Sequence, residues 1–350
     1  MYSVYQHWDP LEVCIVGASY PPEFYSFITN SRVRLVMERI AQETEEDYQE
    51  LIKLLTRFGV EVLRPEVGSD WRPYYNQQAN KINSPPMYPR DYSLMLGNRW
   101  FWRAWPTGGS QPLPDTMPAV NHDPMWHTIV TEMKQRADRY ITGPLACPDT
   151  LSWDGAMLTR VGKDLYHGTH NYKENTESKL AWLNANLPEY RHHIVNTGGH
   201  SDGVFCVVKP GLIISTYDIE SYAESFPGWE VVYIPNTTGD MQKFNEFKNK
   251  NHGKWWVPGE ELNDDFTDFV ESWLGHWMGY AEETVFDVNM LMLDPDNIAV
   301  TAYNETLFRK FEQHGITPHI VNLRHRYFWD GGLHCCTSDV SRRGTLQDFF

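Results

Sequence analysis

Two hydrophobic periods alternate along this chain, and each predicts a different kind of element. Residues 12–17 form a short apolar run that ends in a glycine, which predicts a strand. Residues 33–58 carry apolar side chains at helical spacing, among them Val36, Ile40 and Leu51, and Gly59 follows the predicted helix. The next apolar run, residues 60–65, predicts a second strand.

Later in the chain, short apolar runs separated by turn residues predict further strands, and longer amphipathic stretches predict helices. The predicted strands are 92–96, 99–104, 156–161, 164–167, 192–196, 203–208, 211–216, 229–234, 288–293, 298–301 and 318–323, and the predicted helices are 125–138, 174–186, 265–277 and 304–314. Residues 66–91 predict an ordered loop. Residues 106–124, with five prolines and two glycines, predict a long surface excursion or lid.

A hairpin, a helix and a strand recur in this order roughly every 60–70 residues, without visible sequence self-similarity. Repetition of one supersecondary unit favours either a closed, propeller-like array or one mixed sheet, and the pattern alone leaves both open. Composition does not shift along the 350 residues, so we expect an α/β chain with a single domain over 1–350.

Charge and cysteine usage narrow the class of protein. The formal net charge of −16 argues against nucleic-acid binding and suits a site that attracts cationic small molecules. The five cysteines form no CxxC pair, and the N-terminal residues lack the pattern of a signal peptide. No apolar run approaches the ~20 residues of a membrane helix. We therefore expect a cytoplasmic protein without a membrane partner, in which thiols stay reduced.

The run from Gly331 to Cys336, GGLHCC, carries the strongest chemical signal. A Gly-Gly pair permits a tight backbone approach and is expected to expose the side chains that follow, which makes Cys335 a candidate nucleophile. His200, in the run GGHSD, is a candidate base before a predicted strand. Asp202 lies two residues further on and is expected to share its side of the strand start.

Two more acids open predicted strands. Asp91 follows Pro89-Arg90, and Asp154 lies in the run SWDG. Taken alone, each of these two acids is more often an ordinary exposed residue, and His200 is as often a solvated turn residue as a base. Their shared position at strand starts is more informative, because a closed array of strands would bring them together. No HxxxH or HExxH spacing occurs, so we expect neither a metal nor another cofactor.

Several segments, taken together, resemble the amidinotransferase family of the guanidino-group-modifying (pentein) superfamily. They are WDPLEVCIVG (8–17), PRD (89–91), HSD (200–202), NMLMLD (289–294), VNLRH (321–325), GGLHC (331–335) and DVSRRGTLQ (339–347). The resemblance spans almost the whole chain. It implies a five-bladed α/β propeller of ββαβ modules that moves an amidino group from arginine to an acceptor amine. It implies small-molecule partners and allows for a homodimer.

By motif, the resemblance gives each candidate a role. Cys335 corresponds to the family nucleophile and His200 to the acid/base, while Asp154 takes the place of the His-pairing acid. Asp91 and Asp202 fall where the family grips the guanidinium. The same site would also serve a hydrolase of the deiminase or dihydrolase type. A non-catalytic binding protein is disfavoured, because every catalytic residue type is retained.

The chain departs from the family at three places. Ile219 stands where glycine-using members have an arginine for the substrate carboxylate, and Glu282-Glu283 stands near their hydroxyl pair. These changes leave the identity of the donor and acceptor open. Cys336 replaces a bulky aromatic residue and is predicted to be a packing residue.

Overall fold

The computed structural model describes residues 1–102, 124–142, 154–169, 176–216, 222–234, 255–275, 277–278 and 288–350. Within these ranges the strands divide into five three-stranded sheets and one two-stranded ribbon. The ribbon pairs β3 (Tyr75–Asn76) with β4 (Lys81–Ile82). Because the strands fall into separate sheets, the structure excludes one mixed sheet.

Each three-stranded sheet has an antiparallel first pair and a parallel second pair. Within each sheet the strands lie in the following spatial order. The first two sheets are β5 (Ser93–Leu96), β6 (Arg99–Trp102) and β7 (Arg139–Thr142), and β8 (Leu158–Val161), β9 (Asp164–Thr169) and β10 (Arg191–Asn196). The other three are β11 (Phe205–Lys209), β12 (Leu212–Ser215) and β13 (Glu230–Tyr233); β14 (Leu291–Asp294), β15 (Asn297–Val300) and β16 (Thr317–Ile320); and β17 (Thr337–Arg342), β1 (Leu11–Val16) and β2 (Glu61–Leu63).

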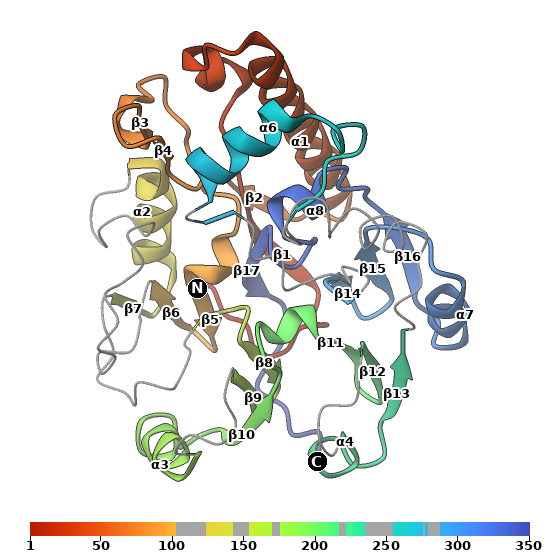
Figure 1. Cartoon of the computed structure of the whole chain (residues 1–350). Coiled ribbons are helices and arrows are strands. Elements are labelled where there is room, and N and C mark those ends of the chain that lie inside the picture. Colours follow the sequence, from red (N-terminus) through yellow and green to blue (C-terminus); the bar gives the residue numbers. More distant parts are fainter. Residues whose placement is uncertain are drawn as a thin grey trace.

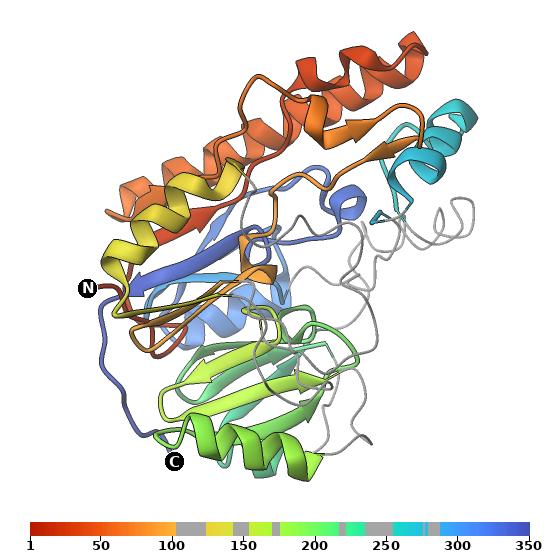
Figure 2. The same ribbon diagram turned by 90° about the vertical axis from the view of Figure 1, so that its left-hand side faces the viewer.

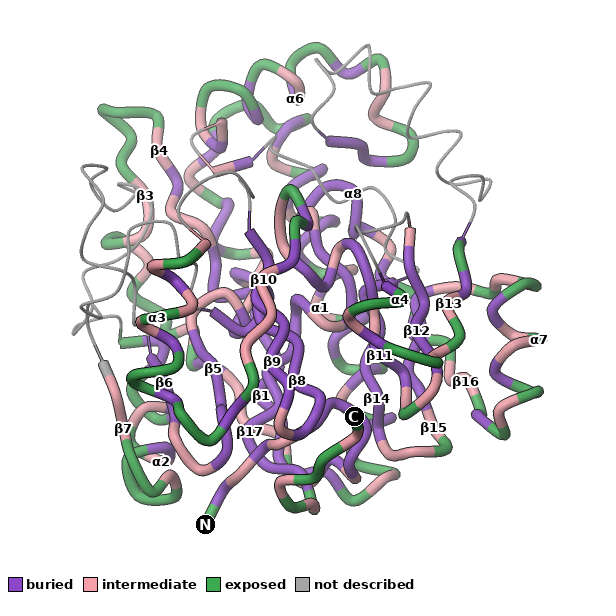
Figure 3. Tube along the Cα trace, turned by 90° about the horizontal axis from the view of Figure 1, so that it is seen from below, coloured by how far each residue is buried: buried purple, intermediate pink, exposed green. Residues whose placement is uncertain are grey.

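A helix connects the second and third strand of every one of these sheets, as a parallel connection requires. The five helices are α1 (Ser31–Arg57), α2 (His127–Arg136), α3 (Thr176–Asn186), the single turn α4 (Tyr222–Ser225) and α7 (Glu305–Gln313). The sheets lie around a common centre (Figure 1). In the side view α1 and α3 lie on opposite outer sides of the sheets (Figure 2). The buried chain concentrates in the central strands (Figure 3).

The longest helix shows how the sequence fixes local structure. The Asn30 side chain accepts hydrogen bonds from the backbone N–H groups of Arg32 and Val33, at 3.0 and 3.4 Å, which caps the start of α1. Val36, Ile40 and Leu51 are buried on one face, as their spacing predicts. Gly59 follows the helix with φ +76°, a conformation that favours glycine.

Strand β17 is buried along its whole length although its sequence, TSDVSR, is largely polar. Its central Asp339 is 1% exposed and forms ion pairs with three buried arginines, Arg90, Arg160 and Arg342. The three cations hold the pKa of Asp339 well below its usual range against the effect of burial. This charge cluster joins the sheet of β17, β1 and β2 to the sheets that contain β5 and β8.

The structure confirms the predicted α/β class and most of the predicted elements, with specific differences. Residues 66–91 are not a plain loop, because they contain the β3–β4 ribbon and the 3-10 turns η2 (Arg72–Tyr74) and η3 (Pro89–Asp91). The predicted helix 265–277 begins as α6 (Asp264–Phe269) and continues as the π-helical turn η6 (Val270–Leu274). Strands β7 and β17 and helix α8 (Arg326–Trp329) were not predicted. The predicted lid at 106–124 lies almost entirely outside the described residues.

No helix in the described ranges has the length and apolar character that crossing a bilayer requires.

Candidate active site

Five chain segments, one before the first strand of each three-stranded sheet, meet at the centre of the molecule. Hydrogen bonds join them into a closed ring. The backbone N–H of Gly155 donates to the Arg90 carbonyl (3.0 Å), and that of Asp202 donates to the Ala156 carbonyl (3.3 Å). The three acids predicted at strand starts, Asp91, Asp154 and Asp202, therefore lie in neighbouring turns that hydrogen bonds connect.

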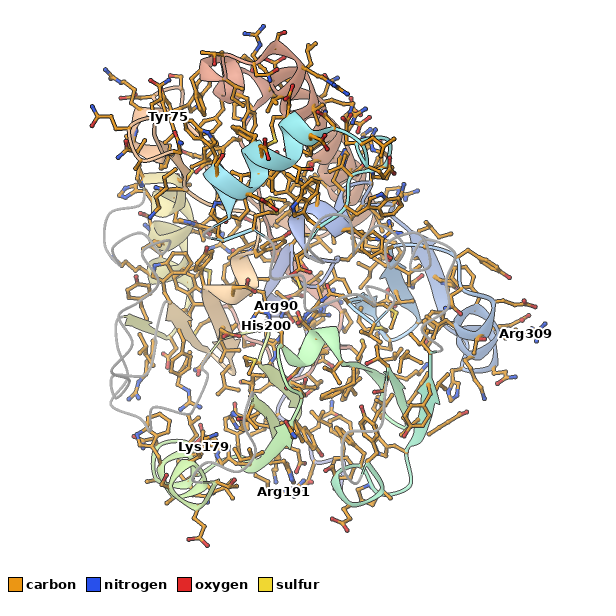
Figure 4. The ribbon with its side chains drawn as sticks, viewed as in Figure 1. Tyr75, Arg90, Lys179, Arg191, His200 and Arg309 are labelled. Atoms are coloured by element: carbon orange, nitrogen blue, oxygen red, sulfur yellow. The ribbon has the colours of Figure 1, made fainter. Side chains whose placement is uncertain are left out.

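The other half of the ring runs through Asn289 and the loop before β17. The Asn289 side-chain amide donates to the Asp202 carbonyl (3.2 Å), and the backbone N–H of His334 donates to the Asn289 carbonyl (3.3 Å). The Arg90 guanidinium Nε then donates to the His334 carbonyl (2.8 Å) and closes the ring. Figure 4 shows Arg90 and His200 near the middle of the molecule, on the segments that precede β5 and β11.

Cys335 lies at this meeting point, two residues before β17. Its sulfur is 2.9 Å from Asn289 Nδ2 and 3.6 Å from Asp202 Oδ2. The expectation that the Gly-Gly pair exposes the thiol is wrong, since Cys335 is only 3% exposed. The glycines serve close packing instead. A Cβ on Gly331 would lie 2.4 Å from the Tyr88 ring.

Asp202 is the acid that the structure places beside the thiol. It is 6% exposed, and its Oδ2 accepts a hydrogen bond from His334 Nδ1 at 2.7 Å. Burial, together with the nearby Arg90 guanidinium, lowers the pKa of His334 well below its usual value. His334 is therefore neutral near pH 7, with its proton on Nδ1, and it orients the Asp202 carboxylate.

The relation expected between His200 and Asp202 is wrong in its local geometry. Residues Ser201–Gly203 form the 3-10 turn η5 with His200 as its N-terminal cap, so strand alternation does not apply there. Strand β11 begins only at Phe205. The two residues still share one turn at the centre of the molecule.

Asp91 and Asp154 also lie in turns rather than in strands. Asp91 ends the turn η3, two residues before β5, and is partly buried. Asp154 is 6% exposed, and its Oδ1 accepts from the backbone N–H groups of Ala156 (2.9 Å) and Met157 (2.8 Å). One carboxylate oxygen of Asp154 therefore fixes the turn that leads into β8.

A cavity of about 20 Å³ lies behind Asp202 and His334, with His7 and Arg342 among its lining residues. This volume suffices for about one water molecule. Burial lowers the pKa of His7 well below its usual value, and its Nε2 accepts from the backbone N–H of Arg160 (3.0 Å). The cavity is thus lined by two neutral imidazoles.

Sequence reasoning missed two residues that contact the site, Asn289 and His334. Both stood inside the segments that carry the family resemblance, yet neither was assigned a role. One signal was available: Asn289 is the second residue of the predicted strand 288–293, close to the position that the acids take at the strand starts of the other units.

Of the positions at which the chain departs from the family, Ile219 and Glu282-Glu283 lie outside the described residues. Cys336 is 1% exposed and packs in the main hydrophobic core, as predicted for a packing residue. No cluster of three or more metal-binding side chains occurs in the described part of the chain.

Sequence comparison finds amidinotransferases that are similar to this chain over nearly its whole length. Mitochondrial glycine amidinotransferase of Xenopus laevis is 27% identical over 402 aligned residues, which cover 99% of this chain and 84% of that protein. L-arginine:L-lysine amidinotransferase of Pseudomonas savastanoi pv. phaseolicola is 22% identical, covering 99% and 95%. No family profile matches the chain.

Solved structures show the same fold. Inosamine-phosphate amidinotransferase from Streptomyces griseus superposes with a TM-score of 0.64 at 20% identity, covering 100% of this chain and 99% of that one. A dimethylarginine dimethylaminohydrolase is a more distant neighbour, with a TM-score of 0.53 at 11% identity, covering 93% and 98%. The chain is thus a homologue of the amidinotransferases, and guanidine hydrolases share its fold at lower similarity.

Proposed function

We propose that this homologue of the amidinotransferases transfers an amidino group from arginine, or a closely related guanidino donor, to an acceptor amine through a covalent amidino-Cys335 intermediate. One observation carries the proposal. This chain matches amidinotransferases over nearly its whole length, and its Cys335 sulfur lies 3.6 Å from the buried Asp202 carboxylate, inside the ring of five segments that precede the first strands of the sheets. The donor is taken from the name of the arginine:lysine relative.

In this proposal the carboxylates of Asp91 and Asp202 hold the donor. A guanidinium is a planar cation whose N–H groups match a carboxylate in paired, charge-assisted hydrogen bonds. Asp202 is already oriented by His334, so little rotamer entropy is lost when it binds. A guanidinium held by Asp202 would have its central carbon next to the Cys335 sulfur.

The reaction then proceeds in two balanced steps. The thiolate attacks the guanidinium carbon, a C–S bond forms, and the C–N bond to the departing amine breaks as His200 gives that nitrogen a proton. The acceptor amine next attacks the same carbon, His200 takes its proton, and the C–S bond breaks. Asp154 pairs with the imidazole and favours its charged form.

We further infer that the five sheets are the blades of one α/β propeller and that residues 1–350 form a single domain. Two facts support this: all five sheets share one strand order, and the first strand of each follows a ring segment. A cytoplasmic location is also proposed, because Cys14, Cys206 and Cys336 are free thiols.

The covalent intermediate provides the decisive test. The protein is incubated with arginine, quenched in acid and digested, and mass spectrometry should find one added amidino group on Cys335. Cys335→Ser should abolish the adduct and all turnover. Cys336→Ser, which alters a packing thiol, is the matched control and should keep most activity.

Product analysis separates transfer from hydrolysis. With arginine and a pool of amines, a transferase releases ornithine and forms a new guanidino compound. Release of citrulline and ammonia without a guanidino product would instead show a deiminase. A label on Cys336 would overturn the assignment of the nucleophile.

A further inference from the structure

Asn289 is fully buried two residues before β14, and its side chain is saturated with contacts to the site. Its Oδ1 accepts from the backbone N–H groups of His334 (2.8 Å) and Cys335 (3.0 Å). Its Nδ2 donates to the Cys335 sulfur (2.9 Å) and to the Asp202 carbonyl (3.2 Å). All four hydrogen-bonding positions of the amide are therefore used.

These partners fix the orientation of the amide. If oxygen and nitrogen were exchanged, the NH₂ group would face two backbone N–H donors and the oxygen would face a carbonyl. The N–H group that points at the Cys335 sulfur is thus set by the network. Gly332 makes the approach feasible, because a Cβ there would lie 2.7 Å from the Asn289 Cβ and Oδ1 atoms.

The Cys335 sulfur lies between one donor and one acceptor. As a thiol it can give its proton to Asp202 Oδ2 and accept from Asn289 Nδ2. As a thiolate it repels the Asp202 carboxylate, but its bond from Asn289 becomes charge-assisted and stronger. Asn289 is therefore the contact that favours the reactive form.

We propose that Asn289 stabilises the thiolate form of Cys335 and aims its sulfur, which makes this asparagine a catalytic residue supplied by the segment that precedes β14. The inference rests on the proposed function only in taking Cys335 as the nucleophile. Arrival of a guanidinium at Asp202 would remove the thiol's acceptor and leave the Asn289 N–H as the sulfur's partner. The amide thus serves each half-reaction in which the sulfur carries negative charge.

The test is the pH dependence of iodoacetamide alkylation, with the modified cysteine identified by tandem mass spectrometry. Asn289→Ala removes both functions of the amide. Asn289→Asp is isosteric and keeps the acceptor for the two backbone N–H groups, but it replaces the donor with a second carboxylate. In both variants the alkylation midpoint of Cys335 should rise by about one to two pH units, and most in Asn289→Asp.

Asn304→Asp is the matched control, because it makes the same change at the cap of α7, where the oxygen accepts from the backbone N–H of Leu307. Its alkylation midpoint should equal that of the wild type.

A measurement without an Asn289 variant completes the test. In wild-type protein labelled with ¹⁵N-asparagine, one side-chain amide should titrate together with Cys335, and this titration should vanish in Cys335→Ser.

An unchanged midpoint in the folded variants, or no titrating amide in the wild type, would overturn the proposal. Such a result would leave Asn289 with only a packing role. The outcome is independent of turnover. A shifted midpoint in a protein that transfers no amidino group would contradict the proposed function and support the role of Asn289.

Discussion

Asp202 is the side chain in which the hydrogen bonds of the site converge. It faces the Cys335 sulfur, accepts from His334 and receives the Asn289 amide on its carbonyl. Two of these three contacts come from residues that the sequence did not single out. Neither Asn289 nor His334 belongs to a motif with a distinctive residue spacing, so only the folded structure reveals their contacts with Asp202.

Asp202→Asn should weaken arginine binding about tenfold or more. The neutral amide can still accept from His334, but it no longer balances the guanidinium charge, and a hydrogen bond to a charged group contributes roughly 1.5–3 kcal/mol. Isothermal titration with arginine on the Cys335→Ser background measures the effect. Asp264→Asn, an exposed acid at the start of α6, is the control and should leave the affinity unchanged. Equal affinities for all three proteins would remove Asp202 from the donor site.

At the scale of elements, hydrophobic periodicity predicted the strands whose burial depends on apolar side chains, such as β11, β12, β14 and β15. It failed for β17, where Ser338, Asp339, Ser341 and Arg342 are buried by ion pairing and hydrogen bonding. A polar run of this kind has no apolar alternation to detect. The turns η3 and η5 were read as strand starts for a related reason, since one turn of 3-10 helix is too short to leave a periodic signal.

The ion cluster of β17 should be essential for stability. In Asp339→Asn the three buried guanidinium groups lose their shared countercharge, and breaking a buried ion pair in this way typically costs about 3–5 kcal/mol of unfolding free energy. Urea unfolding followed by tryptophan fluorescence measures the loss. Glu305→Gln breaks an exposed pair with Arg309 and should cost less than about 0.5 kcal/mol. A comparable small loss for both variants would show that the cluster contributes little.

At the scale of the whole molecule, the N-terminal and C-terminal parts of the chain together form the fifth three-stranded sheet. Strand β1 pairs with β17, and the C-terminal tail then runs past the β8–β9 turn, where the Lys163 N–H donates to the Gln347 carbonyl. Beyond this point Phe349 packs on Trp8 and Phe350 on Trp229. The recurring hairpin, helix and strand predicted most of the other four units and missed only β7 and α4. The closing unit was hidden, because its first strand lies more than 300 residues after its second.

Three buried imidazoles predict that the molecule loses stability in mild acid. Burial lowers the pKa of His7, His167 and His334 well below the usual value of about 6.5. Between the lowered values and 6.5 the unfolded chain binds more protons than the folded one, so stability rises with pH in this window and falls as the pH drops below 6.5. From pH 6.5 to 5.5 the unfolded chain takes up protons at these positions that the folded chain does not, so the free energy of unfolding should fall across this range.

Urea unfolding at fixed temperature across this pH range measures the slope, above the range in which ordinary carboxyl groups titrate. His167→Gln should reduce the slope, because one of these proton uptakes is lost. His127→Gln, at an exposed imidazole on α2, is the matched control substitution. Because His334 orients Asp202, the same protonation that destabilises the fold would also disturb the donor site, so arginine affinity should fall in parallel with stability. A stability that stays constant from pH 6.5 to 5.5 would show that these imidazoles titrate normally in the folded chain.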